Sequence, residues 1–145
     1  MDKMNLDTLS YEVMIYKDTE EPFTSSFNKQ KEEGLYIDKI SKEPLFSSED
    51  QYDAGCGWPS FTKGITTDCI SYTNDYSHNL SRIETKSKIQ DSHLGHVFED
   101  GLKNRGGLRF CINGAALDFV PLSKLMNSPY ENFLPYFKSY INKNK

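Results

Sequence analysis

The stretch GGLRFCIN, residues 106–113, decides how the rest of this sequence can be interpreted. Because successive side chains of a β-strand point to opposite faces, the stretch has an apolar face and a polar face. The apolar face carries Leu108, Phe110 and Ile112, and the polar face carries Arg109, Cys111 and Asn113. A nearby cation lowers the pKa of a thiol, and the thiolate is the form that acts as a nucleophile. The strand therefore predicts a reactive Cys111, with a cysteine packed as a small hydrophobe as the alternative.

The composition describes an acidic protein of one domain. The length of 145 residues and the 37% of hydrophobic residues suffice for one core, and 13% of aromatics favour β structure. The net charge of −4 argues against a nucleic acid partner, because phosphate binding requires a basic face. No apolar run has the length of a signal peptide or a membrane span, so we expect a cytoplasmic protein with no membrane partner. Three cysteines, an odd number, do not suit a secreted disulfide framework.

The pattern along the chain predicts mainly antiparallel β structure with helices at both ends. A short helix within residues 5–14 could be capped by Asp7 or Ser10. Strands are expected within residues 35–48, 68–75, 79–89, 91–107 and 108–122, and an irregular loop over residues 52–64. We expect a single domain over residues 1–145, with a core over about 11–121 and a helical tail over 122–145 that Pro129 and Pro135 interrupt.

Two histidines in the segment DSHLGHVF are candidate proton donors. A spacing of three puts His93 and His96 on opposite faces of a regular strand, but Gly95 between them permits a bulge that could turn both the same way. Histidine titrates near neutral pH and can hand over a proton. Metal ligation and a purely structural role remain open for this pair. His78, in a polar turn, is expected at the surface.

The segment GCGWPSF, residues 55–61, predicts a rigid loop that presents an aromatic ring. Trp58 is the only tryptophan, and its glycine and proline neighbours suit the wall of an apolar pocket, with a core aromatic as the alternative. Cys56 is a candidate for a second reactive thiol, whereas we interpret Cys69 as structural. A structural zinc site usually needs two Cys-x-x-Cys pairs, and the sequence has none, so we expect no metal and no cofactor.

Several motifs together resemble the methionine-R-sulfoxide reductase B family over about residues 11–121. They are EEPFTSSF (20–27), EEGLY (32–36), PLFSS (44–48), YDAGCGWPSF (52–61), DSHLGHVFEDG (91–101) and GGLRFCINGAAL (106–117). The resemblance implies two facing antiparallel sheets with short N-terminal helices. It also implies reduction of methionine sulfoxide in proteins or peptides, with thioredoxin as the reducing partner, and we expect a monomer.

The resemblance assigns roles to individual residues. Cys111 becomes the attacking cysteine and Cys56, 55 positions earlier, the resolving cysteine. Arg109 tunes the site electrostatically. Trp58 packs against the substrate methyl group, and we expect Phe110 to contact the substrate as well. The polar groups around the thiolate and the sulfoxide oxygen are then His93, His96 and Asn113.

The four zinc-ligand positions of many family members are replaced here. They are occupied by Asp38, Ser41, Ser87 and Gln90, so the chain resembles the zinc-free branch, whose segments must be held together by packing and hydrogen bonds.

Two other functions fit part of the pattern. A thiol hydrolase would use Cys111 and a histidine as nucleophile and base, with no need for Cys56. A β-rich binding module that has lost its metal would carry the cysteines as relics, and it would form no sulfenic acid at Cys111.

Overall fold

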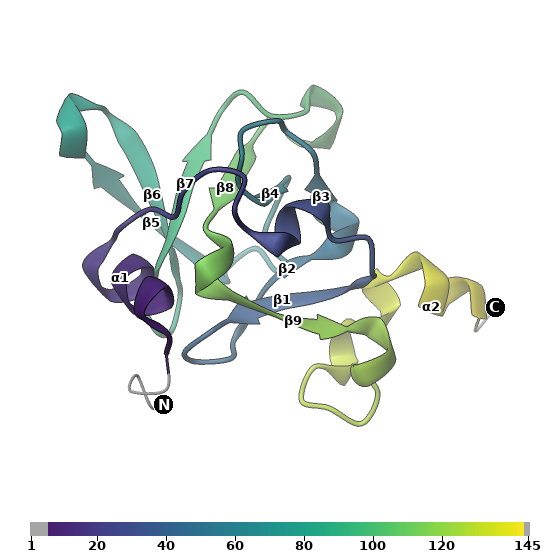
Figure 1. Cartoon of the computed structure of the whole chain (residues 1–145). Coiled ribbons are helices and arrows are strands. Elements are labelled where there is room, and N and C mark those ends of the chain that lie inside the picture. Colours follow the sequence, from purple (N-terminus) through teal and green to yellow (C-terminus); the bar gives the residue numbers. More distant parts are fainter. Residues whose placement is uncertain (1–5, 144–145) are drawn as a thin grey trace.

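The computed structural model describes residues 6–143 and contains two antiparallel sheets (Figure 1). The three-stranded sheet has the order β2 (Pro44–Ser47), β1 (Gly34–Asp38), β9 (Leu117–Pro121). The six-stranded sheet has the order β3 (Gln51–Tyr52), β4 (Ser60–Phe61), β8 (Arg109–Ile112), β7 (His93–Phe98), β6 (Arg82–Ser87), β5 (Ile70–Asp75). The predicted fold class, mainly β with two antiparallel sheets, is confirmed. In Figure 1 the β5–β6 hairpin extends away from the body of the molecule.

Aromatic side chains fill the core between the sheets. Tyr36 and Phe46 come from the three-stranded sheet, and Phe61 and Phe110 come from the six-stranded sheet. The Phe46 and Phe61 rings stack with their centroids 4.4 Å apart, and the Tyr36 ring meets Phe61 edge-on at 5.1 Å. Such pairs add to the stabilisation from apolar burial. Aromatic residues, which are enriched in the sequence, therefore pack where the two sheets face each other.

The N-terminal helix begins where the sequence places a cap. Helix α1 spans Thr8–Tyr16, and the Asp7 side chain accepts a hydrogen bond from the Ser10 backbone N–H at 2.8 Å. Val13 and Met14 on this helix are buried against the core, and the helix contacts β7 and the turn that follows β8. Short 3₁₀ turns lie at Ser26–Lys29, Ser48–Asp50, Ser77–Asn79, Lys103–Arg105 and Gly114–Ala116.

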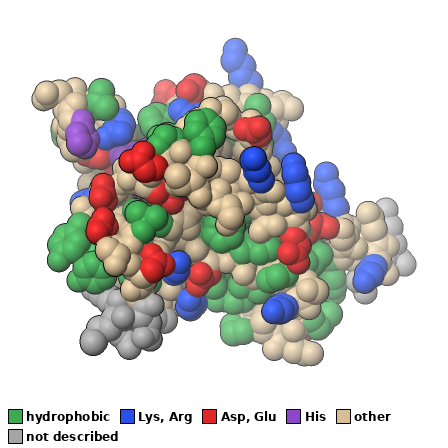
Figure 2. All heavy atoms as spheres, in the orientation of Figure 1, with side chains coloured by type: hydrophobic (Ala, Val, Ile, Leu, Met, Phe, Trp, Pro, Cys, Tyr) green, Lys and Arg blue, Asp and Glu red, His purple; other side chains and the backbone are tan. Residues whose placement is uncertain are grey.

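The C-terminal tail is helical in short pieces rather than as one interrupted helix. It forms 3₁₀ turns at Leu122–Lys124 and Glu131–Tyr136, and then the six-residue helix α2 at Lys138–Lys143. Pro135, inside the second turn, lacks the N–H that a continuous helix would need. A second hydrophobic cluster joins the tail to β1, and Figure 2 shows hydrophobic side chains gathered over this part of the molecule. Its buried members are Leu35, Ile37, Ile65, Leu125, Leu134 and Phe137.

One carboxylate joins the β1–β2 turn to the β6–β7 turn. Glu43 accepts hydrogen bonds from the Ser41 hydroxyl at 2.6 Å and from the backbone N–H groups of Ile89 and Gln90, both at 2.9 Å. Asp38 accepts the backbone N–H groups of Ile40 and Ser41 within the first turn. We call this arrangement the Glu43 clasp. It links two turns that no strand pairing joins directly.

No helix in the described part of the chain is long and apolar enough to cross a membrane.

Candidate active site

A row of directly paired residues crosses five strands of the six-stranded sheet. Tyr52 pairs with Ser60, Ser60 with Cys111, Cys111 with His96, and His96 with Glu84. Directly opposed residues share one face of an antiparallel sheet. Phe110 and Ile112, the neighbours of Cys111, point the other way and are buried in the core. The register therefore places the Cys111 thiol on a polar face, as the alternation of the strand predicted.

The two thiols that the sequence singled out lie side by side. The Sγ atoms of Cys56 and Cys111 are 3.6 Å apart, and both cysteines are free. The Ser60 hydroxyl lies 3.3 Å from Cys56 Sγ and 3.0 Å from the Trp58 carbonyl oxygen. The loop between β3 and β4 thus carries Cys56 back over the strand that holds Cys111.

A small pocket of about 80 Å³ opens beside Cys111. It is lined by Thr19, Trp58, Arg82, Gly95, His96, Phe98, Cys111 and Asn113. Its size suits a small group such as the end of one side chain. The pocket combines an aromatic wall, a thiol and an imidazole within one cavity.

A bulge in β7 brings the two histidines to one side. Thr85 pairs with Gly95 and Lys86 pairs with His93, which leaves one extra residue on β7. The imidazole centroids of His93 and His96 are only 5.6 Å apart. A Cβ atom on Gly95 would lie 2.1 Å from the Cys111 carbonyl oxygen, so only glycine allows this approach of β7 to β8. The bulge that Gly95 suggested is present.

Each histidine has its own carboxylate. His96 Nε2 lies 2.7 Å from an oxygen of Asp75, and this hydrogen bond holds the pKa of Asp75 far below its usual value. His93 Nδ1 lies 2.7 Å from Glu84, and both of these side chains are buried. Burial lowers the pKa of His93, although the Glu84 carboxylate opposes this shift. The structure thus brings His96 to the pocket, while His93 lies behind it as a neutral imidazole.

The pKa of Cys111 is raised, not lowered. Burial raises it to about 12 and the neighbouring Cys56 sulfur adds to the effect, whereas Arg109 lowers it only in part. The Arg109 guanidinium is engaged with Asp100 at 2.9 Å and lies 4.3 Å from the centroid of the Phe98 ring. For Cys56 burial is outweighed by hydrogen bonding with Ser60, Trp58 and Cys111, and the pKa is lowered. The expectation that Arg109 makes Cys111 a ready thiolate is wrong, because burial dominates.

Asn113 is held by the backbone on both sides. Its Oδ1 accepts the Glu20 backbone N–H at 3.0 Å, and its Nδ2 donates to the Leu94 carbonyl at 2.9 Å. The Asn113 side chain lines the pocket, and both of these hydrogen bonds are to backbone groups. The Trp58 indole N–H also donates to the chain, at the Glu20 carbonyl oxygen.

A family model, the SelR domain, matches residues 6–121, which is most of the chain. The chain belongs to the SelR family. This is the methionine-R-sulfoxide reductase B domain, so the chain is an oxidoreductase that acts on methionine-R-sulfoxide. The tail that forms the second hydrophobic cluster begins where the matched region ends.

The zinc site found in many SelR proteins has no equivalent donor set here. Asp38 accepts the Ser41 backbone N–H and also interacts with the Ser87 hydroxyl, Ser87 accepts the Ser92 backbone N–H, and the Gln90 backbone is bound by the Glu43 clasp. Within residues 6–143 no three His, Cys, Asp or Glu side chains are grouped so that they could hold a metal ion. These residues therefore do not fit a zinc ion.

Phe110 does not reach the pocket. It is buried in the core, with its ring centroid 5.9 Å from that of Phe46, because it points to the opposite face from Cys111. The prediction that Leu108 belongs to the apolar face of the strand is wrong, since Leu108 precedes β8 and is exposed. Cys69 packs against both hydrophobic clusters and His78 is exposed, as expected.

Several polar residues of the site carried no signal of their own in the sequence. Asp75 and Asp100 lie 21 and 9 positions from the residues they bond, and Ser60 is recognisable only once β4 is paired with β8. Glu20 lies 93 positions before Asn113. Strand pairing and the loops that return to the sheet bring these side chains to the site.

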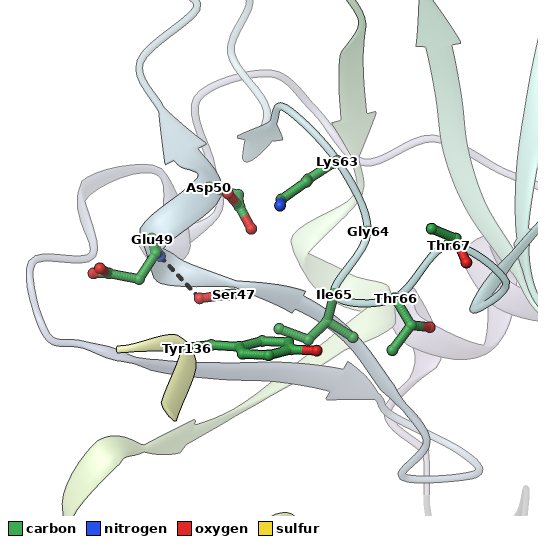
Figure 3. A pocket seen from close by; sticks show the side chains of 9 residues that line it. All are labelled: Ser47, Glu49, Asp50, Lys63, Gly64, Ile65, Thr66, Thr67 and Tyr136. Atoms are coloured by element: carbon green, nitrogen blue, oxygen red, sulfur yellow. Dashed lines mark hydrogen bonds between the residues drawn. The ribbon is translucent and has the colours of Figure 1, made fainter. Parts of the chain in front are cut away.

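A larger cavity of about 610 Å³ lies away from this site, between the β4–β5 loop and the tail (Figure 3). Lys63 and Asp50 point toward one another across it, and the Tyr136 ring lies along one side. Neither cysteine of the pair and none of the other pocket residues borders it.

Proposed function

We propose that this SelR protein reduces methionine-R-sulfoxide with Cys111 as the nucleophile and Cys56 as the resolving cysteine. The observation that carries the proposal is the 3.6 Å separation of the two Sγ atoms. Cys111 lines the small pocket, whereas Cys56 does not. The Cys111 sulfur therefore meets the substrate, and the Cys56 sulfur lies beside it outside the pocket.

The pocket fits the end of a methionine sulfoxide side chain. The Trp58 indole supplies an apolar wall for the methyl group. His96 is the proton donor, because it lines the pocket and its Nε2 is bonded to an ionised Asp75. This arrangement leaves Nδ1 to face the sulfoxide oxygen, and the bond to Asp75 fixes the orientation of the ring. His93 is neutral and buried, so we assign it to the support of β6 and β7.

The reaction proceeds in two steps, each of which conserves atoms and electrons. In the first, Cys111 sulfur attacks the sulfoxide, the S–O bond of the substrate breaks, and the oxygen passes to Cys111 as a sulfenic acid while methionine leaves. His96 protonates the oxygen during this transfer and recovers its proton from the Cys111 thiol. In the second, Cys56 sulfur attacks the sulfenic acid, a disulfide forms and water is released.

A dithiol protein of the thioredoxin type completes the cycle. Its first thiolate attacks the Cys56–Cys111 disulfide, and its second thiol releases the reduced enzyme and leaves the donor as a disulfide. The lowered pKa of Cys56 makes its thiolate the better leaving group. The donor is therefore expected to attack the Cys111 sulfur and to expel the Cys56 thiolate, because attack at Cys56 would expel the Cys111 thiolate, whose pKa is raised.

The thiol hydrolase alternative uses the same Cys111, with His96 and Asp75 as base and orienting group. It gives no role to Cys56, although this residue lies against the nucleophile. Family membership and the paired thiols both favour the reductase.

Turnover on the separated R and S epimers of a methionine sulfoxide peptide, with thioredoxin as donor, tests the proposal. We expect release of methionine from the R epimer only. A Cys56→Ser variant is expected to release about one methionine per enzyme and then stop with thioredoxin. Continued cycling of that variant with thioredoxin would move the resolving role to another thiol.

A further inference from the structure

We propose that Glu20 is a positioning residue that holds both Trp58 and Asn113 against Cys111. The proposal rests on the reductase function given above and names a residue on which its pocket depends. Glu20 lies in the segment EEPFTSSF, 91 positions before the nucleophile, and touches neither sulfur.

The Glu20 carboxylate is buried without a cation. Its side chain accepts the backbone N–H groups of Gly114 and Ala115, both at 2.9 Å, and the residue is only 3% exposed. Within residues 6–143 no Lys, Arg or His forms an ion pair with it. Burial of a carboxylate is costly unless hydrogen bonds compensate for lost water. The two bonds therefore fix the chain around Glu20 to the turn that directly follows the catalytic strand.

The backbone of the same residue reaches the pocket on two sides. The Glu20 N–H donates to Asn113 Oδ1 at 3.0 Å, and the Glu20 carbonyl accepts the Trp58 indole N–H at 3.0 Å. The preceding residue, Thr19, lines the pocket itself. One anchored residue thus sets the position of the aromatic wall and of the amide at once.

The two sulfurs are held by a different part of the structure. Cys111 lies on β8 and is paired with Ser60 of β4, whose hydroxyl contacts Cys56. Loss of the Glu20 anchor should therefore disturb the fit of the sulfoxide but leave the Cys56–Cys111 geometry intact. This separates a positioning role from a general contribution to folding.

The test compares Glu20→Gln with Glu21→Gln, a matched change at the exposed neighbouring acid. In Glu20→Gln an NH2 donor replaces one of the two acceptor oxygens, so it meets one of the two backbone N–H groups as a second donor. We expect kcat/KM for an R-sulfoxide peptide to fall about ten- to hundredfold in Glu20→Gln, because a small misplacement of positioning groups is that costly. Glu21→Gln should match the unmodified protein.

Hydrogen peroxide provides a second measurement, because it can oxidise a thiol without occupying the pocket that receives the substrate methyl group. It transfers one oxygen to one of the two paired thiols and leaves as water, and the sulfenic acid then condenses with the other thiol to a Cys56–Cys111 disulfide and a second water. We expect this disulfide to form at the same rate in both variants and in the unmodified protein. An equal loss of sulfoxide reduction and of peroxide-driven disulfide formation in Glu20→Gln would overturn the positioning role. No loss of either reaction in that variant would overturn it as well. Failure of the unmodified protein to reduce the sulfoxide would instead contradict the reductase function.

Trp58 also allows a measurement that needs no variant. It is the only tryptophan, so one indole N–H signal in the NMR spectrum reports on the bond to Glu20. We expect slow exchange of this proton with solvent in the unmodified protein, and a red-shifted Trp58 emission in Glu20→Gln. Rapid exchange of the indole proton would overturn the proposal even if Glu20→Gln did not fold.

Discussion

At the scale of single residues, the surroundings of Cys111 are built by neighbours on other strands and loops. Its own segment predicted the polar face, but Cys56, His96 and Asp75 reach it only through strand pairing and the β3–β4 loop. Burial then reverses the expected effect of Arg109 on the thiol. Which cysteine faces the pocket could be predicted from alternation, whereas which cysteine ionises first could not.

The order in which the thiols react with an alkylating agent follows from their pKa values. Cys56, with its lowered pKa, is expected to react with iodoacetamide before Cys111 near pH 7, because only the thiolate reacts. Cys111 should gain reactivity as the pH rises toward about 12. Mass spectrometry of the reduced protein after brief labelling measures this order. Earlier labelling of Cys111 at pH 7 would contradict the electrostatics described here.

Replacement of Asp75 is expected to slow the reaction. The Asp75 carboxylate stays ionised because its hydrogen bond with His96 holds its pKa low, and the same bond fixes the imidazole beside the pocket. In Asp75→Asn an amide holds the imidazole less firmly, so we expect kcat/KM for an R-sulfoxide peptide to fall about ten- to hundredfold. Asp68→Asn, at an exposed position, serves as the control. An unchanged kcat/KM in Asp75→Asn would contradict the role of His96 as the donor.

At the scale of elements, the bulge in β7 and the Glu43 clasp explain how a sequence without metal ligands builds the site. The segment DSHLGHVF predicted the bulge, because Gly95 is needed where β7 approaches β8. The clasp could not be predicted, since Glu43 and Gln90 are 47 positions apart and no motif links them. The longer strands followed from alternation, whereas β4 lies within the range predicted as an irregular loop, and the bonds between turns depend on tertiary packing.

The clasp should contribute measurably to stability. In Glu43→Gln the carboxamide can accept fewer of the three hydrogen bonds, and we expect a loss of about 1–3 kcal/mol in the free energy of unfolding. Urea unfolding measures this loss, with Glu32→Gln at an exposed position as the control. A chelator should leave the Tm of the unmodified protein unchanged. A large decrease in Tm with the chelator would show that a metal, not the clasp, joins the turns.

At the scale of the whole molecule, the catalytic face and the C-terminal tail lie on different parts of the two-sheet body. The site uses the six-stranded sheet, and the tail covers the three-stranded sheet through the second hydrophobic cluster. The motifs predicted the two sheets, but the tail has no long periodic pattern and carries prolines within it. Its packing onto β1 therefore could not be inferred from sequence.

The tail is expected to support stability without affecting catalysis. Phe137 is fully buried, so Phe137→Ala should lower the free energy of unfolding by about 3–5 kcal/mol. The kcat/KM at a temperature well below the Tm should remain that of the unmodified protein, because the cluster does not touch the pocket. Ile141→Ala, at an exposed tail position, serves as the control. A fall in kcat/KM of the folded Phe137 variant would instead link the tail to the site.

In the proposed function Cys111 takes the sulfoxide oxygen and Cys56 resolves the sulfenic acid. The most direct measurement is peptide mapping of the reduced protein after reaction with one equivalent of an R-sulfoxide peptide and no added reductant. We predict one methionine released per enzyme and one disulfide, between Cys56 and Cys111, with Cys69 still a free thiol. A disulfide to Cys69, or methionine release with both Cys56 and Cys111 still reduced, would contradict the account.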